Sequence, residues 1–249
     1  MKKLLFFFLF LCVANLDAQT PKQITFTEAD CIPAGSSTLT WQAINKKLND
    51  VFIDANISDN LPSHRRIDNI QTFFSVSITG TITNIGAYAF IFCDKLVSID
   101  VSSATTIGFQ AFAECSALEN INMPSAVTIG EIAFYGCDKL ISIDIPLVKI
   151  IEKGVFLNCR SLESADMPKV TAIGERAFYN CNSLQSITIL TSTPPTLEED
   201  VFGEVDILDS RVPDSCTLRV ANPKAVNKYK KDKSWKSQFL PRKILPVSP

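Results

Sequence analysis

The sequence has a single histidine, His64, among its 249 residues, and it lacks the motifs on which most enzyme chemistry depends. A histidine-dependent triad would have to include His64, yet no serine or cysteine lies in a nucleophile motif such as Gly-x-Ser-x-Gly. Neither a Walker-type phosphate loop nor a Gly-x-Gly-x-x-Gly motif is present. We therefore expect a protein that is not an enzyme and carries no cofactor, with His64 as a surface residue.

The chain also lacks any apolar run long enough to span a bilayer. The run Leu4–Val13 follows a pair of lysines and is about half the length of a transmembrane helix, which is typical of a signal peptide. Cleavage after Ala18 would remove residues 1–18 and leave Gln19 as the new N-terminus. We expect an exported protein, secreted, periplasmic or at the cell surface, with no transmembrane segment in the mature chain.

Charge of one sign is not in large excess over the whole chain. Without Lys2, Lys3 and Asp17 the protein has 22 basic and 25 acidic residues, a net charge of −3, which predicts no general affinity for nucleic acid. The distribution is uneven, because the segment from Arg219 to Lys243 holds nine basic residues and one acid. This basic segment is either an ordinary solvated surface or a binding surface for anionic glycans or lipid head groups.

A 22-residue repeat dominates the middle of the sequence. Each of five copies has the order Ile-Gly-x-x-Ala-Phe-x-x-Cys-x-x-Leu, with small departures, and a phenylalanine and a cysteine occur in every copy. Repetition at this period predicts a solenoid whose coils bury a continuous core. The predicted core columns are Phe90, Cys93, Phe112, Cys115, Phe134, Cys137, Phe156, Cys159, Phe178 and Cys181.

The end of each repeat predicts a short strand, because Leu-x-x-Ile-x-Ile alternates apolar and polar residues. Further strand patterns occur at Phe73, Val76 and Ile78 and at residues 216–220. We expect an α/β repeat fold, a leucine-rich-repeat solenoid with about seven parallel strands, 22-residue coils and helical caps at both ends.

Glycines recur at one position of the repeat and predict a tight turn there. They are Gly86, Gly108, Gly130 and Gly174. The fourth repeat has Glu152 at this position and Gly154 two residues later. We therefore expect that coil to be locally irregular.

The pattern Leu-x-x-Ile-x-Ile-Pro followed by Ile-Gly-x-x-Ala-Phe-x-x-Cys resembles the bacterial BspA-like class of leucine-rich repeats, over Phe73 to Phe202. The resemblance implies a secreted or cell-surface protein that binds host extracellular matrix or other cells. We expect a signal peptide at 1–18, an N-terminal cap with one helix at 19–72, the repeat array at 73–206, and a C-terminal cap at 207–249 with a last strand and a basic helix.

Seven cysteines remain in the exported chain. Residues in one solenoid column lie one strand spacing apart, about 4.7–4.9 Å, whereas a disulfide needs Cβ atoms at about 3.8 Å. We expect the five repeat cysteines to be buried free thiols, with a disulfide as the alternative. No metal site is expected, because 22-residue intervals and one histidine do not suit zinc. The pattern does not determine the state of Cys31 or Cys216.

Strand residues that point outward form the candidate ligand-binding surface on the concave side of the solenoid. Ten small polar residues make up its two columns: Ser98, Asp100, Asn120, Asn122, Ser142, Asp144, Ser164, Asp166, Ser186 and Thr188. Asp144 and Asp166 should be neighbours, and like charges opposed on a sheet are destabilising. They form either a solvated face or a site for a basic protein segment, a cation or a glycan. Protein binding in adhesion is the favoured function, with a glycan-binding accessory protein of a nutrient-uptake system or a structural scaffold as alternatives.

Overall fold

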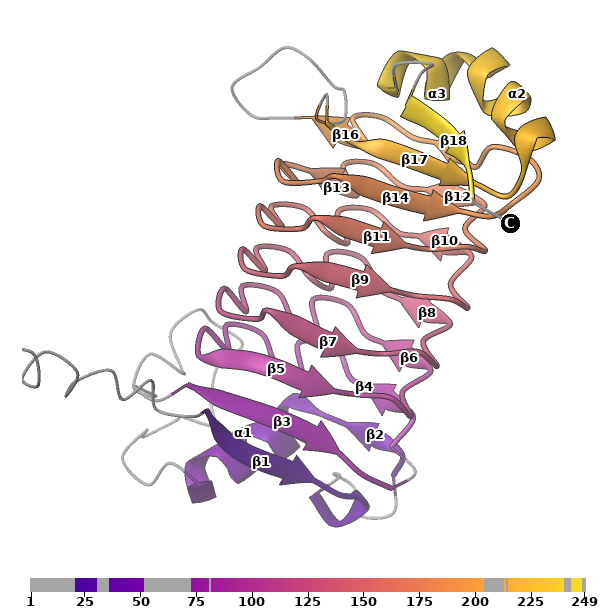
Figure 1. The fold of residues 1–249 in the computed structure, drawn as a ribbon. Helices are drawn as coiled ribbons and strands as arrows, with labels where there is room; N and C mark the ends of the chain where they lie inside the picture. Colours follow the sequence, from indigo (N-terminus) through magenta and orange to yellow (C-terminus); the bar gives the residue numbers. More distant parts are fainter. Residues whose placement is uncertain are drawn as a thin grey trace, which may run out of the picture.

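The computed structural model describes residues 21–30, 36–51, 73–80, 82–203, 213, 215–239 and 243–247. The expected signal peptide at residues 1–18, as well as Cys31 and His64, lies outside these residues. The described chain winds into a stack of coils (Figure 1). Each coil adds one strand to a main sheet on one side and, in most cases, a two-residue strand to a second sheet on the other.

Every strand pair among the described residues is parallel. The main sheet contains β1 (Lys22–Phe26), β3 (Phe74–Ile78), β5 (Leu96–Asp100), β7 (Asn120–Asn122), β9 (Ser142–Asp144), β11 (Ser164–Asp166), β14 (Ser186–Ile189), β17 (Thr217–Val220) and β18 (Ile244–Pro246). The second sheet contains β2 (Thr38–Leu39), β4 (Asn84–Ile85), β6 (Thr106–Ile107), β8 (Thr128–Ile129), β10 (Ile150–Ile151), β12 (Ala172–Ile173) and β15 (Thr196–Leu197). The remaining elements are β13 (Phe178–Tyr179) paired with β16 (Phe202–Gly203), the 3₁₀-helix η1 (Glu28–Asp30), and the helices α1 (Trp41–Val51), α2 (Pro223–Lys231) and α3 (Lys233–Gln238).

The predicted solenoid is confirmed, and two strands that the repeat pattern did not predict, β1 and β18, extend the main sheet at its ends. One predicted position was wrong. Phe73 was expected to take the leucine position opposite Leu96, but Phe74 takes it and the register shifts between Phe74 and Ser75. Phe73 is consequently 44% exposed.

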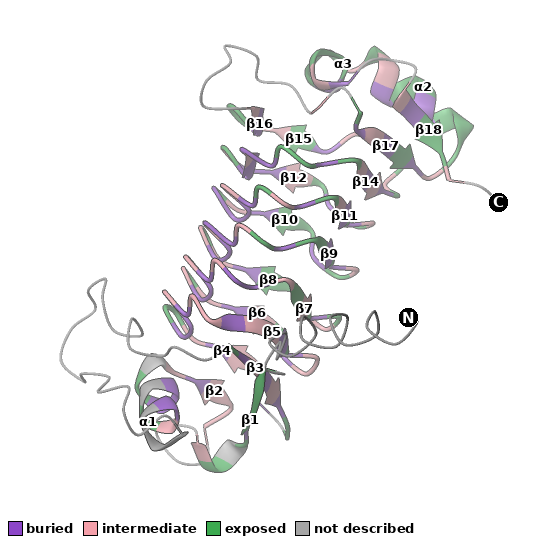
Figure 2. Ribbon diagram, turned by 60° about the vertical axis from the view of Figure 1, so that its left-hand side comes forward, coloured by how far each residue is buried: buried purple, intermediate pink, exposed green. Residues whose placement is uncertain are grey.

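The phenylalanine column forms a continuous stack of rings through the centre of the core. Successive rings from Phe90 to Phe202 stack with centroids 5.2–5.7 Å apart, and all are buried. Figure 2 shows that buried segments recur from coil to coil along the stack. Phe26 packs edge-on against Phe90 at one end, while Trp235 and Phe239 close the column against Phe202 at the other. Burial of one such ring is worth roughly 1.5–3 kcal/mol, so stability depends on neighbouring coils.

The cysteine column forms a second ladder beside these rings. The thiol of Cys115 donates to the carbonyl oxygen of Phe90 at 3.0 Å, and the next three repeats make the same bond at 3.2 Å. All five repeat cysteines are buried and free, as predicted, and Cys216 is also buried and free. Cysteine therefore fills a small apolar space and satisfies a carbonyl of the preceding coil.

The recurring glycines do not serve the turn for which the sequence predicted them. None of the four has a positive φ; instead, a Cβ atom on Gly108 would lie 2.6 Å from the backbone nitrogen of Ala87 in the preceding coil. The other three would meet backbone atoms at 2.7–2.9 Å. The glycines thus permit close stacking of coils, which a side chain would prevent.

The turn conformation falls two residues later, mostly on residues other than glycine. The residues with positive φ in this column are Tyr88, Gln110, Ile132, Gly154 and Arg176. Gly154 is the one member of this column that adopts the conformation without steric cost. Ile132, at φ 55°, is β-branched and therefore strained.

Both sheets are interrupted at one coil boundary, which we call the seam. Among the described residues β5 pairs with β7 and β9 with β11, yet no ladder joins β7 to β9 or β8 to β10. Glu152 lies here in place of a stacking glycine, so the predicted irregularity of this coil is confirmed. Hydrogen bonds still cross the seam. On the turn side the amides of Ile132, Phe134 and Gly136 donate to carbonyl oxygens of the next coil at 2.9–3.0 Å, and Phe134 stacks on Phe156 at 5.5 Å. Beside the main sheet the amide of Ile141 donates to the oxygen of Glu119 at 3.2 Å.

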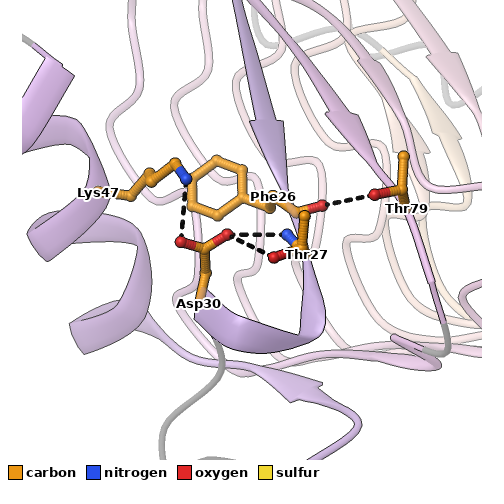
Figure 3. Close-up of polar contacts among 5 residues, drawn as sticks. All are labelled: Phe26, Thr27, Asp30, Lys47 and Thr79. Carbon is orange, nitrogen blue, oxygen red and sulfur yellow. Dashed lines mark hydrogen bonds and ion pairs between the residues drawn. The ribbon is translucent and has the colours of Figure 1, made fainter.

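The N-terminal end is held by a polar cluster between η1 and α1, which is a helix within the expected N-terminal cap at 19–72. One carboxylate oxygen of Asp30 accepts from the Lys47 ammonium at 3.0 Å, and the other accepts from the Thr27 backbone at 2.8 Å (Figure 3). Burial alone would raise the pKa of Asp30, but these hydrogen bonds outweigh it and lower the pKa below its ordinary 3.8. The ammonium also lies 6.0 Å from the centroid of the Phe26 ring.

The C-terminal end differs from the single basic helix that the sequence predicted. Asp232 has an extended backbone, ends α2, and starts α3. Its carboxylate accepts from the backbone amides of Ser234 and Trp235 at 3.0 and 3.1 Å. An aspartate N-cap therefore divides the basic segment into two helices.

Candidate functional site

The main sheet presents a polar outer surface, which we call the strand face. In each central strand the apolar residue is buried or partly buried between two side chains that point outward, because successive side chains alternate across a strand. The structure places all ten predicted residues on this face, in two columns, and none of the ten is buried. Ser142, Ser164 and Ser186 follow one another in the first column, as Asp144, Asp166 and Thr188 do in the second.

The two columns continue beyond the predicted residues at both ends. At the N-terminal end the first column adds Gln23 and Ser75 and the second adds Thr25 and Ser77. At the C-terminal end Thr217 follows Ser186 and Arg219 follows Thr188. The sequence pattern predicted β3 and β17 but not β1, and the predicted columns did not include residues of these three strands.

Side chains in the N-terminal half of the strand face are largely paired with one another. Ser98 donates to Ser75 at 2.8 Å. The carboxylate of Asp100 accepts from the Asn122 amide at 3.1 Å and from the backbone of Ser102 at 2.9 Å. This half therefore offers few uncommitted polar groups to a ligand.

The C-terminal half carries an acid pair that forms no ion pair with any residue in the described part of the chain. Asp144 and Asp166 are direct neighbours in the parallel ladder, and both are exposed. No ion pair to either occurs among the residues that the structure describes. Two carboxylates about 5 Å apart repel each other by roughly 1 kcal/mol in water, so the structure retains an unfavourable contact that a bound cationic group would relieve.

Two further exposed side chains lie on the same half of the molecule as this acid pair, and the repeat pattern did not predict either of them. Ile141, which precedes Ser142, is 42% exposed. Arg219 follows Thr188 in the second column, two strands beyond Asp166. The charge along the column thus changes from acidic to basic within about 10 Å.

The thiols of the repeat are unsuited to nucleophilic chemistry. Burial raises the pKa of Cys93, Cys137, Cys159 and Cys181, so these groups remain protonated at neutral pH. Burial also raises the pKa of Cys216, to about 12. Among the described residues, no group of three metal-ligating side chains comes together.

Parallel coils of 22 residues, each contributing a strand from a leucine-containing segment, define a leucine-rich-repeat solenoid. Residues 66–163 and 105–220 match the family described as "BspA type Leucine rich repeat region", in six copies. These matches cover more than half of the chain. The protein therefore belongs to the BspA-type leucine-rich repeat family, as the sequence pattern predicted.

Similar solved structures are bacterial repeat proteins. A leucine-rich repeat protein from Bacteroides ovatus is 26% identical with a TM-score of 0.47, and the match covers 59% of this chain and 36% of that one. A T. pallidum leucine-rich repeat protein is 22% identical with a TM-score of 0.47, covering 59% of this chain and 72% of that one. A leucine-rich cell surface protein from Faecalibacterium prausnitzii is 24% identical with a TM-score of 0.44, and the match covers 61% of this chain and 56% of that one.

The matched part of the chain spans about a third of the length of the Bacteroides ovatus protein. A search of curated proteins gave no match. In the part of the chain that the structure describes, none of the helices has the length and apolar character needed to cross a bilayer.

Proposed function

We propose that this protein is an exported binding protein that holds a segment of another protein against the C-terminal half of its strand face. The observation that carries the proposal is the exposed pair Asp144 and Asp166, which has no countercharge among the described residues. Repeat solenoids commonly bind their partners along such extended surfaces. The expected signal peptide, residues 1–18, would bring the mature chain to the cell surface or beyond.

The surroundings of the acid pair define the chemistry of the partner. A lysine or arginine of the ligand would neutralise Asp144 and Asp166, and an acidic group about 10 Å further along would meet Arg219. Ile141, which is exposed just before β9 begins, provides apolar area that a peptide side chain can cover. Small neighbours such as Ser164 and Ser186 leave the backbone of the ligand room to approach.

The family resemblance supports adhesion to host matrix or to other cells as the biological setting. The alternatives are a glycan-binding accessory protein of a nutrient-uptake system, for which the rows of serine and asparagine would supply hydrogen bonds, and a structural scaffold. The exposed Ile141 and the change from acidic to basic side chains between Asp166 and Arg219 favour a protein ligand, because a neutral glycan would not pair with these charges.

The test is binding of residues 19–249 to an immobilised panel of host matrix proteins and purified glycans. The proposal predicts saturable binding to a protein that weakens with salt and falls about tenfold or more in the double variant Asp144→Asn, Asp166→Asn. A matched control, Glu131→Gln with Glu199→Gln, removes the same charge from exposed residues outside the main sheet and should bind normally.

Each other outcome has a definite meaning. Binding to glycans alone would support the function of a glycan-binding accessory protein in nutrient uptake. If the protein bound neither matrix proteins nor glycans, a role as a structural scaffold would be favoured. Equal weakening in the double variant and in the control would show that net charge matters and the strand face does not.

A further inference from the structure

The C-terminal cap carries a concentration of positive charge that the solenoid core does not require. Five exposed lysines on α2 and α3 form what we call the cap surface: Lys224, Lys228, Lys231, Lys233 and Lys236. The two helices lie across the end of the coil stack (Figure 1), and their outer faces are exposed (Figure 2).

The helices are fixed in orientation by their buried sides. In α2 the side chains of Ala225, Val226 and Tyr229 are buried. In α3 the buried Trp235 donates from its indole nitrogen to the carbonyl oxygen of Pro195 at 2.7 Å. Because these anchors point inward, the lysines project outward, and Lys224, Lys228 and Lys231 follow the four- and three-residue spacing of one helical stripe.

The positive charge is uncompensated within the described structure. None of the ion pairs among the described residues involves a lysine of the cap surface. The array also has lysines outside these ion pairs, such as Lys139, Lys149 and Lys169, but they are spread over three coils, whereas the five cap lysines lie on two adjacent helices. The one acid of this segment, Asp232, uses its carboxylate to cap α3.

Helix stability explains only part of this pattern. Lysines in the last turn of α2, such as Lys228 and Lys231, interact favourably with the helix dipole. Lys224 lies in the first turn of α2 and Lys233 is the first residue of α3, where a positive charge opposes the dipole. The helix dipole therefore does not account for the positive charge at these two positions.

The side chains of the cap surface indicate which class of polyanion it would bind. A membrane-binding helix inserts an exposed apolar face, but the apolar side chains of α2 and α3 are buried and the residues between the lysines are polar: Asn227, Ser234 and Ser237. Single-stranded nucleic acid would need exposed aromatic rings for stacking, and Tyr229 and Trp235 are both fully covered. The polar residues can instead hydrogen-bond sugar hydroxyls.

We propose that the cap surface binds an acidic polysaccharide, one that carries sulfate or carboxylate groups along its chain. Lysine ammonium groups pair with the anionic substituents, while Asn227 and Ser234 contact the hydroxyls. The lysines of this surface lie on α2 and α3 and not on the strands of the strand face, so different residues hold the two ligands. Attachment through the cap would leave the strand face free for its protein ligand.

The test is binding of residues 19–249 to immobilised heparin and to polygalacturonate, measured by biolayer interferometry over a range of salt concentrations. The triple variant Lys224→Gln, Lys228→Gln, Lys231→Gln should lose affinity by about tenfold or more. The control Lys139→Gln, Lys149→Gln, Lys169→Gln removes the same charge from exposed array lysines and should stay within about twofold. Thermal melts establish that both variants are folded.

Several results would overturn the proposal. One is absence of salt-sensitive binding to either polysaccharide by the wild-type protein. Another is an equal loss of affinity in both triple variants, which would show that binding depends on the net charge of the protein and not on the cap surface. Tighter binding to anionic phospholipid vesicles or to DNA than to both polysaccharides would assign the cap surface to a different class of ligand.

Discussion

Truncation of Phe134 to alanine should both destabilise the solenoid and separate its two halves. The ring is fully buried and stacks on Phe112 at 5.3 Å and on Phe156 at 5.5 Å. Loss of a buried phenylalanine costs about 3–5 kcal/mol, a large fraction of the roughly 5–15 kcal/mol that stabilises most proteins. The stack on Phe156 is also one of the contacts that cross the seam, where both sheets are interrupted.

Phe112→Ala is the matched control. Phe112 is equally buried and stacked on both sides, at 5.2 and 5.3 Å, but lies between coils whose sheets are continuous. Both variants should lose a similar free energy of unfolding. In Phe134→Ala alone, residues 82–141 and 142–203 should unfold at clearly different urea concentrations.

Urea unfolding followed by circular dichroism gives the total loss, and hydrogen exchange measured by mass spectrometry at each urea concentration follows the two halves. A total loss below about 1 kcal/mol in both variants would refute the packing argument. If the unfolding midpoints of the two halves were separated equally in Phe134→Ala and Phe112→Ala, the idea that the seam is a weak boundary would be refuted.

Three other predictions concern backbone stacking, turn strain and acid stability. Gly108→Ala should lower the free energy of unfolding by about 1–3 kcal/mol in urea titrations, because the added Cβ would lie 2.6 Å from the backbone nitrogen of Ala87; an unchanged midpoint would contradict this. Ile132→Asn should raise stability by up to about 1 kcal/mol, because asparagine tolerates the positive φ of 55° that strains a β-branched residue; a lower melting temperature would contradict it. Asp30→Asn should lower the melting temperature at neutral pH but not at about pH 2. The reason is that the pKa of Asp30 in the folded protein lies below its ordinary 3.8. The ionised carboxylate therefore stabilises the fold above pH 3.8, and this stabilisation is lost as the pH falls through the lowered pKa. A difference between wild type and variant that does not depend on pH would show that the carboxylate charge plays no part.

The repeat made most of the fold predictable, because each position of the array was observed five times. The burial of Phe134 and the free thiol of Cys137 follow from their columns. Strands β1 and β18 occur once each outside the repeat, so no column revealed them. The choice of Phe74 over Phe73 depends on a register shift that two adjacent phenylalanines do not specify.

Other features depend on contacts between coils that sequence patterns do not contain. The close approach behind Gly108 looks in the sequence like a turn signal, and the break at Asp232 looks like one acid in a basic helix. The columns of the candidate site were predictable from strand alternation. The absence of an ion pair to Asp144 or Asp166 among the described residues was not predictable, because it depends on where the basic side chains lie in the folded chain.

Carboxyl-group footprinting would show whether the strand face holds the protein ligand. The mature protein is labelled with a carbodiimide and an amine, alone and saturated with the matrix protein from the panel that binds it most tightly. We expect Asp144 and Asp166 to become protected while Glu131 and Glu199 label as before. Unchanged labelling of Asp144 and Asp166 at saturation would contradict it, because the ligand would then be bound away from the strand face.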